Sequence, residues 1–285
     1  MKPIHPFIAA ARPHQWLKNF LVFSAPLAAG LIHNREILFR TTGVAFLFLI
    51  ISVGVYLFND LRDIEIDRYH PVKSQRPIAN GDLSQRSATI MAPLLTLSSL
   101  SYGFFISTSL GICLAVYVFI NIFYSMKAKS IPYLELLLVS SGFVIRAISG
   151  GIASGIPLSF WFISVISCTS FFLATGKRYA ESSQYEINRT RPVLSQYTLK
   201  TLGVLRVVST ALAVVTYGFW LSQTSTTRGT FSILSLMIFI VTISRYNFRV
   251  QQGHGEDPIR TLTGDFWLLS LLTLWATTYC LAIYG

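Results

Sequence analysis

The sequence predicts an all-α polytopic membrane protein with nine transmembrane helices. Of its 285 residues, 52% are hydrophobic and only 12% are charged, whereas a soluble domain carries about 25% charged residues. Nine apolar runs are close to the length that crosses a bilayer, and because hydrocarbon offers no partner to a free backbone amide, each run is expected to be a helix. The runs are residues 18–33, 41–58, 87–106, 109–126, 133–151, 157–175, 198–221, 229–244 and 264–284.

These nine runs follow one another without a linker or a break in composition, so one transmembrane domain is expected over residues 1–285. The first and eighth runs are short and need flanking residues to cross the bilayer. Residues 1–12 lack the apolar core and small-residue cleavage site of a secretory signal. Charged loops follow the second and sixth runs, a spacing that suggests two related four-helix units.

The basic residues lie mainly on one side of the predicted membrane. With the N-terminus in the cytoplasm, eighteen of the 23 Lys and Arg residues fall in cytoplasmic segments and three on the opposite side. This is the positive-inside bias of a multi-pass protein of the plasma (inner) membrane. The net charge of +11 is therefore interpreted as a mark of topology, and no nucleic-acid partner is expected.

The first long charged stretch, NDLRDIEIDRYHPVKSQRPIANG, follows the second apolar run and covers residues 59–81. Asp60, Asp63 and Asp67 are spaced i, i+3, i+7, so they would share one face of a helix that continues past the membrane. Aligned carboxylates repel one another unless a cation lies among them, and hard oxygen ligands suit Mg²⁺. The alternative is a solvated helix end that the neighbouring arginines neutralise.

The same stretch places two bases in a restricted loop. Lys73 and Arg76 lie between Pro71 and Pro77, whose rings limit the backbone. Arg suits bidentate phosphate contact and Lys acts as a point charge. Acids for Mg²⁺ beside bases for phosphate are the arrangement that binds and ionises a diphosphate. His70 either adds a hydrogen-bond donor or is a turn residue.

A second charged loop follows the sixth run and contains Lys177, Arg178 and Glu181. Lys177 and Glu181 are one helical turn apart. Two cations and one acid suit a ligand that carries phosphate. The alternative is that both cations anchor the helix on the cytoplasmic side.

Polar residues also cluster where the first run begins. Arg12, Gln15, Lys18 and Asn19 form a polar face that either grips a lipid phosphate or lies among lipid headgroups. The two interpretations stay open on the sequence alone.

Five further residues are weaker candidates. Arg146 lies deep in the fifth run, where a charge needs a partner or a wet cavity, and a cavity-lining role is expected for it. Tyr124 ends the fourth run, where anchoring at the membrane interface is the favoured interpretation. The acids of the last cytoplasmic loop are interpreted as balancing nearby bases; they are Glu256, Asp257 and Asp265.

The charged stretch over residues 59–81 resembles the first aspartate motif of the UbiA-type membrane prenyltransferase superfamily, whose members are bundles of nine helices. The likeness extends over most of the chain and is strongest to the branch that transfers a phosphoribosyl group. Isoprenyl-transferring members carry a second aspartate-rich motif, which the loop of Lys177 and Arg178 lacks. The further stretches that carry the likeness are ARPHQWLKNFLVFSAPLAAG, GFVIRAISGG, FFLATGKRYAE and RYNFRVQQGHGEDPIRTL.

This resemblance implies an Mg²⁺-dependent enzyme with a cytoplasmic active site. The donor would be 5-phosphoribosyl 1-diphosphate and the acceptor a polyprenyl phosphate of the decaprenyl type, giving a lipid for cell-envelope glycan synthesis. Asp60, Asp63 and Asp67 would hold the metal and take part in catalysis. The residues expected to bind substrates are Asn59, Lys73, Arg76, Lys177, Arg178, Glu181, Lys18, Gln15, Tyr124 and Arg146.

Two alternative functions remain open at this point. An isoprenyl transferase acting on an aromatic or glycerol-type acceptor would share the fold and the first motif but predicts a second acidic cluster. A transporter of anionic metabolites explains the basic cytoplasmic side but gives no reason for carboxylates at metal-binding spacing, and the clear inverted repeats of many transporters are missing. The sequence does not decide whether the chain forms a homo-oligomer.

Overall fold

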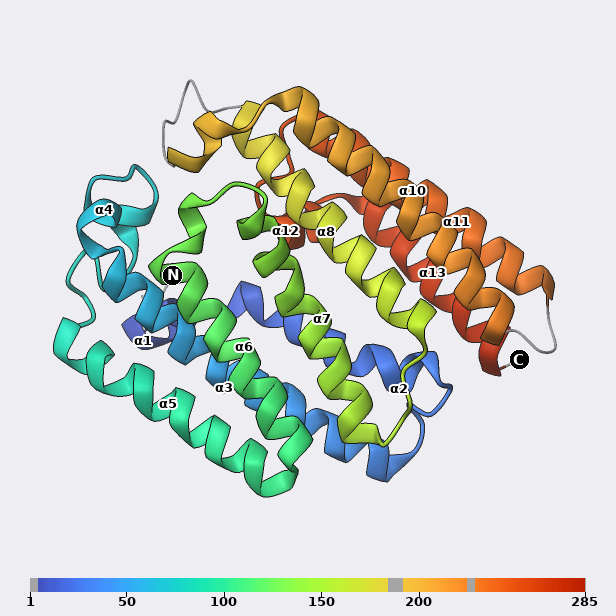
Figure 1. Cartoon of the computed structure of the whole chain (residues 1–285), viewed down its shortest axis with the longest axis horizontal. Helices are drawn as coiled ribbons and strands as arrows, with labels where there is room; N and C mark the ends of the chain where they lie inside the picture. Colours follow the sequence, from blue (N-terminus) through green and yellow to red (C-terminus); the bar gives the residue numbers. More distant parts are fainter. Residues whose placement is uncertain (1–4, 184–191, 225–228, 285) are drawn as a thin grey trace.

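A computed structural model of the chain is a helical bundle in which long helices lie side by side (Figure 1). The structure describes residues 5–183, 192–224 and 229–284, and these residues contain no β-strand. Within these described ranges, eight helices are long and apolar enough to cross a membrane. They are α3 (Arg35–Arg62), α5 (Gln85–Ile106), α6 (Thr108–Met126), α7 (Leu134–Ser154), α8 (Phe160–Ser183), α10 (Leu199–Thr224), α11 (Gly229–Gln251) and α13 (Phe266–Tyr284).

The first predicted span is built differently from the other eight. It forms a 3₁₀-helix, η1 (Pro13–Phe23), followed by the short α2 (Ser24–Ala28). Pro26 cannot donate a backbone hydrogen bond and its ring clashes with the preceding turn of a continuous helix. A new helix therefore starts at Ser24 and takes Pro26 into its first turn. Eight of the nine predicted spans are long helices, and the first is a broken one.

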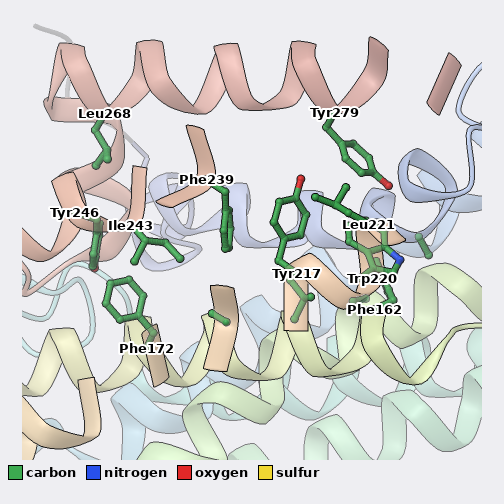
Figure 2. Close-up of a cluster of buried hydrophobic side chains, with 14 of the residues drawn as sticks. Phe162, Phe172, Tyr217, Trp220, Leu221, Phe239, Ile243, Tyr246, Leu268 and Tyr279 are labelled. Atoms are coloured by element: carbon green, nitrogen blue, oxygen red, sulfur yellow. The ribbon is translucent and has the colours of Figure 1, made fainter. Parts of the chain in front are cut away.

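The long helices form two groups that meet along α7 and α8. In the first group α3 packs against α5, and α6 against α5 and α7; in the second, α10 packs against α8 and α11 against α13. Figure 2 shows the core of the second group, where Tyr217 and Trp220 of α10 lie between α8 and α13. The segment η1 contacts both α3 and α7. It therefore lies inside the bundle.

Short elements complete the end at which α3 finishes and α13 starts. They are α1 (Pro6–Ala10), α4 (Ile64–Arg68), η2 (Lys73–Gln75), η3 (Ala128–Ser130), η4 (Pro192–Gln196) and α12 (Pro258–Gly264). This is the side predicted to be cytoplasmic. The basic residues 2, 189, 191 and 228, which entered the charge count, lie outside the described residues.

Gly150 is the position where α7 and η1 come closest. A Cβ atom added at Gly150 would lie 1.9 Å from the carbonyl oxygen of Val22, so the two backbones would have to separate. Overpacking of this kind costs about 1–3 kcal/mol. We expect Gly150→Ala to lower the melting temperature of the detergent-purified protein by several degrees. Gly43→Ala is the control, because nothing lies within 4 Å of its added Cβ; equal melting temperatures would contradict this packing.

Candidate active site

The three aspartates of the first motif lie where α3 ends. The predicted continuous helix is interrupted at Asp63, which ends α3 and precedes α4 with φ −100° and ψ 5°. Asp60 and Asp67 nevertheless face each other, because Nη1 of Arg76 donates to Oδ1 of Asp60 at 2.9 Å and to Oδ2 of Asp67 at 2.6 Å. Both carboxylates are almost fully buried, at 3% and 2% exposure.

Two further bases complete this group. Arg12 forms a salt bridge with Asp60, and Lys129 of η3 forms one with Asp63. We call this set, Asp60, Asp63 and Asp67 with Arg12, Arg76 and Lys129, the carboxylate–cation cluster. No sequence motif links Lys129 to Asp63, which lies 66 positions earlier.

The loop after α4 holds Arg76 in place. His70 accepts hydrogen bonds at Nδ1 from the backbone amides of Val72 and Lys73, both at 3.2 Å, so of its two interpretations the structure supports the turn residue. Lys73 lies in η2, three residues before Arg76.

Asn59, one residue before the first aspartate, accepts a hydrogen bond from Ser125 of α6 at 3.0 Å. This contact ties the end of α3 to α6.

The second charged stretch, expected to be a loop, instead forms the end of α8, and its two neighbouring cations differ in exposure. The side chain of Lys177 is 32% exposed and lies 3.9 Å from Glu181. Arg178 is 2% exposed, and its guanidinium donates to both oxygens of Glu135 at 2.5 Å, to Tyr124 at 3.3 Å and to Glu181. Arg178 therefore has all three guanidinium nitrogens engaged within the protein, whereas Lys177 is partly exposed.

This buried ion pair was missed by the sequence reasoning. Glu135 is completely buried and also accepts a hydrogen bond from Tyr197 at 3.1 Å. Burial and the neighbouring Glu135 carboxylate raise the pKa of Tyr197 well above its usual range. An acid two residues into an apolar run was the available signal, since such a charge needs a partner.

Arg146 occupies the centre of the first helix group. Nε donates to Asn19 at 2.9 Å, Nη1 to the carbonyl of Gly142 at 2.7 Å, and Nη2 to Ser52 at 3.1 Å and Tyr117 at 2.9 Å. The side chain is 4% exposed. Arg146 does not line the cavity described next; it joins η1, α3 and α6 to α7.

An apolar cavity of about 460 Å³ lies between η1, α2 and α7 on one side and α8 and α10–α13 on the other. Its wall includes Tyr217, Trp220 and Tyr279, part of the aromatic group drawn in Figure 2. Lys18 is the one charged residue among those that line it, and its Nζ lies 5.7 Å from the centre of the Phe143 ring. The cavity therefore suits a long apolar group with one anionic end.

The segment η1 connects this cavity to the carboxylate–cation cluster. Arg12 precedes the first residue of η1 and contacts Asp60, whereas Lys18 faces the cavity. Six residues at the 3₁₀ rise of about 2.0 Å separate them by about 12 Å. Gln15, between them, donates to Asp257 at 3.1 Å and so fixes η1 against the start of α12. One short segment thus places a polar site beside an apolar one.

Of the three acids of the last loop, Asp265 is paired with bases as expected. Asp265 accepts hydrogen bonds from Arg245 at 2.7 Å and lies 3.1 Å from Arg249; the bond from Arg245 holds the pKa of Asp265 below its usual value. Asp257 caps α12.

Comparison with known proteins gives a consistent result. Residues 20–271 match the UbiA prenyltransferase family. Proteins described as decaprenyl-phosphate phosphoribosyltransferase are 38% identical to the chain in Corynebacterium glutamicum and 36% identical in Mycolicibacterium smegmatis, covering 97% of this chain and 86% and 92% of theirs. A UbiA homolog from Archaeoglobus fulgidus bound to GPP and Mg²⁺ superposes with a TM-score of 0.73 at 18% identity, covering 98% of this chain and all of that one.

Proposed function

The chain belongs to the UbiA prenyltransferase family, and on this premise we propose that it transfers the 5-phosphoribosyl group of 5-phosphoribosyl 1-diphosphate to a polyprenyl phosphate of the decaprenyl type, releasing diphosphate. The relatives at 34–38% identity over 97% of the chain are phosphoribosyltransferases by name. The geometric observation that carries the proposal is η1, because it joins the carboxylate–cation cluster to an apolar cavity that holds a single cation, Lys18.

The donor end of this site is the carboxylate–cation cluster. A ribosyl diphosphate is a water-soluble polyanion, so it approaches from the cytoplasmic side and needs bases for its phosphates. The side chains of Arg12 and Arg76 are 22% and 23% exposed, so both are partly accessible to solvent. Lys177, which is 32% exposed at the end of α8, is assigned to a further phosphate of the donor.

The acceptor end is the apolar cavity. A polyprenyl chain stays in the lipid phase while its phosphate must reach the donor. The cavity lining is almost entirely apolar, and Lys18 can meet the phosphate as a point charge. A phosphate bound by Lys18 would lie within about 12 Å of Arg12, measured along η1. The phosphate groups of the two substrates would fill this distance.

The carboxylates of the cluster fit Mg²⁺ by their chemistry, although in their present arrangement no three acidic, His or Cys side chains among the described residues are grouped so that they could hold a metal ion. Carboxylate oxygens are the ligands that Mg²⁺ prefers, usually one or two of them together with substrate phosphates. Asp60 and Asp67 share one Arg76 nitrogen and so lie close together, with Asp63 between them in sequence. These residues would hold the ion, and Mg²⁺ would supply neutralisation of the charge that develops on the departing diphosphate.

The chain's own residues have a positioning role in this reaction. A phosphate monoester with a second pKa of about 6 is largely dianionic at neutral pH, so the acceptor needs no general base. Arg12, Arg76 and Lys177 hold the donor phosphates, and Lys18 holds the acceptor phosphate opposite the leaving diphosphate. The acceptor oxygen then attacks the anomeric carbon as the bond from that carbon to diphosphate breaks.

A single displacement of this kind predicts inversion at the anomeric carbon. The α-configured donor should give a β-linked ribosyl phosphate lipid, because the acceptor attacks from the face opposite the leaving group. NMR of the purified lipid product decides the configuration. An α-linked product, or a ribosylated Asp or Glu trapped without acceptor, would contradict direct displacement.

Lys177 and Lys18 should separate the two substrates. We expect Lys177→Ala to raise the dissociation constant for the ribosyl donor about tenfold and leave lipid binding nearly unchanged, since one hydrogen bond to a charged group is worth about 1.5–3 kcal/mol. Lys18→Ala should do the reverse. Titration of each variant with donor and with a short-chain polyprenyl phosphate measures both constants. A loss of lipid affinity in Lys177→Ala would mean that the assignment is interchanged.

The function itself is tested with purified protein in lipid vesicles. Ribose-labelled donor, Mg²⁺ and polyprenyl phosphate should yield a labelled lipid. Formation of a prenylated product from an isoprenyl diphosphate and an aromatic or glycerol-type acceptor, with no labelled lipid from the ribosyl donor, would favour the isoprenyl transferase. Labelled solute in the vesicle lumen without lipid labelling would favour a transporter.

For the orientation, we propose a cytoplasmic N-terminus and active site in the plasma membrane.

A further inference from the structure

The carboxylate–cation cluster is internally neutralised. Asp60 contacts Arg12 and Arg76, Asp67 contacts Arg76, and Asp63 contacts Lys129. Three carboxylates thus meet three cations, and each cation comes from a segment other than the α3–α4 corner. Within the described residues, the carboxylates that should bind a metal therefore form salt bridges with the cations that should bind a polyphosphate.

This pairing is incompatible with metal binding at the same atoms. Arg12 and Arg76 both donate to Oδ1 of Asp60, and Asp60 is only 3% exposed. A cation that binds this buried carboxylate must replace a guanidinium, and a displaced guanidinium needs a new anion because leaving it unpaired in a partly buried site is costly. A metal ion alone supplies no such anion. A metal ion that arrives with a diphosphate does.

We propose that Arg12, together with Arg76 and Lys129, exchanges partners during loading: in the donor-free protein these cations hold the aspartates, and when the metal and a diphosphate enter together they turn to the phosphate oxygens and release the aspartates to the metal. The inference rests on the proposed function for the identity of the donor. It adds a role for Arg12 and Lys129 and predicts that metal and diphosphate bind cooperatively.

The surroundings of Arg12 suit such an exchange. Its guanidinium lies 4.9 Å from the centre of the Tyr56 ring, so a cation–π contact can stabilise it while it changes anionic partner. Its backbone has φ 53° and ψ 65°, a left-handed conformation that is uncommon for a residue other than glycine, and Pro13 follows it. The side chain is therefore aimed at the end of α3 by a fixed backbone, and only the side chain needs to move.

The test measures binding of metal alone, which requires neither donor nor turnover. Mn²⁺, as a spectroscopic substitute for Mg²⁺, is titrated against detergent-purified protein and followed by electron paramagnetic resonance, first alone and then with inorganic diphosphate. The variant is Arg12→Gln. The matched control is Arg62→Gln, because Arg62 is exposed at the same end of α3 and has no ion pair or hydrogen bond among the described residues.

Three results are expected. In the unmodified protein, diphosphate should tighten Mn²⁺ binding at least tenfold, within the usual range of coupling between ligands. Arg12→Gln should tighten Mn²⁺ binding in the absence of diphosphate by about tenfold more than Arg62→Gln does, because Asp60 loses a competing cation. The same variant should weaken diphosphate binding at saturating Mn²⁺, because the phosphate loses a partner. The two effects have opposite signs, which a merely structural role for Arg12 would not produce.

The contradicting results are equally defined. If Arg12→Gln weakens Mn²⁺ and diphosphate binding in parallel, or changes Mn²⁺ affinity no more than Arg62→Gln does, the exchange is wrong. Lys129→Gln tests the same idea at Asp63 and decides the matter if Arg12→Gln lowers the melting temperature too far for titration. Failure of the proposed function would give a different result: the ribosyl donor would bind no better than inorganic diphosphate. The metal titrations would still test the exchange of partners, because they do not use the ribosyl donor.

Discussion

Asp63→Asn should reduce turnover by at least two orders of magnitude, equivalent to about 2.7 kcal/mol or more of activation free energy. Asn keeps the shape of the side chain and removes an anionic oxygen ligand for the metal. Asp63 is a cleaner target than Asp60, because it is 18% exposed and, among the described residues, forms a salt bridge with Lys129 alone. Initial rates at saturating substrates, measured across a range of Mg²⁺ concentrations, give the effect.

The control for this experiment is a neighbouring acid outside the cluster. Glu65 lies in α4, is 74% exposed and pairs with Arg68 at 3.2 Å on the surface. Glu65→Gln should leave turnover and Mg²⁺ dependence within about twofold of the unmodified protein, since exposed ion pairs contribute little. Normal activity and normal Mg²⁺ dependence in Asp63→Asn would contradict the assignment of the aspartate motif to the metal site.

Arg178→Met should destabilise the protein by about 3–5 kcal/mol, the cost of leaving a buried charge without its partner. Glu135 is completely buried and would keep only the hydrogen bond from Tyr197. The double variant Glu135→Leu with Arg178→Met should recover much of the loss, because it removes both buried charges. Lys177→Met is the adjacent control and should leave stability nearly unchanged, since Lys177 is 32% exposed.

Thermal unfolding in detergent measures this series, and ligand binding interprets it. If Arg178 is structural, the double variant should bind the ribosyl donor with nearly unaltered affinity once it is folded. If Arg178→Met is as stable as the unmodified protein but loses donor affinity, Arg178 is instead a direct donor ligand, as the sequence had suggested. A double variant no more stable than Arg178→Met would contradict the assignment of the loss to an unpaired Glu135.

The membrane-spanning architecture was predictable because hydrocarbon imposes one rule on every segment. An apolar run of sufficient length must be a helix, and the long runs from 41–58 to 264–284 all became one. The first run is broken near Pro26, whose ring interrupts backbone hydrogen bonding, and a separate short helix, α2, follows η1 there. Periodicity predicted one shared face for Asp60, Asp63 and Asp67; the structure brings Asp60 and Asp67 to the same Arg76 nitrogen, although a helix break at Asp63 lies between them.

The pairing of the site residues was not predictable in the same way. Arg12 and Lys129 reach the aspartates from positions 48 and 66 residues away, and spacing along one helix says nothing about such contacts. Arg178 and Arg146 were expected to meet substrate or a cavity because each is a cation in or beside an apolar run. The structure instead pairs them with Glu135 and with the Asn19 side chain. Only the three-dimensional arrangement separates a buried, satisfied arginine from one that faces a ligand.

Isotope tracing tests the central claim, transfer of the ribosyl group to the lipid phosphate, most directly. Polyprenyl phosphate carrying ¹⁸O in its three non-bridging positions is incubated with 5-phosphoribosyl 1-diphosphate, Mg²⁺ and the purified protein, and both products are analysed by mass spectrometry. If the lipid phosphate attacks the anomeric carbon, the ribosylated lipid keeps all three ¹⁸O atoms and the released diphosphate has none. Loss of ¹⁸O from the lipid, its appearance in diphosphate, or the absence of any ribosylated lipid would contradict the account.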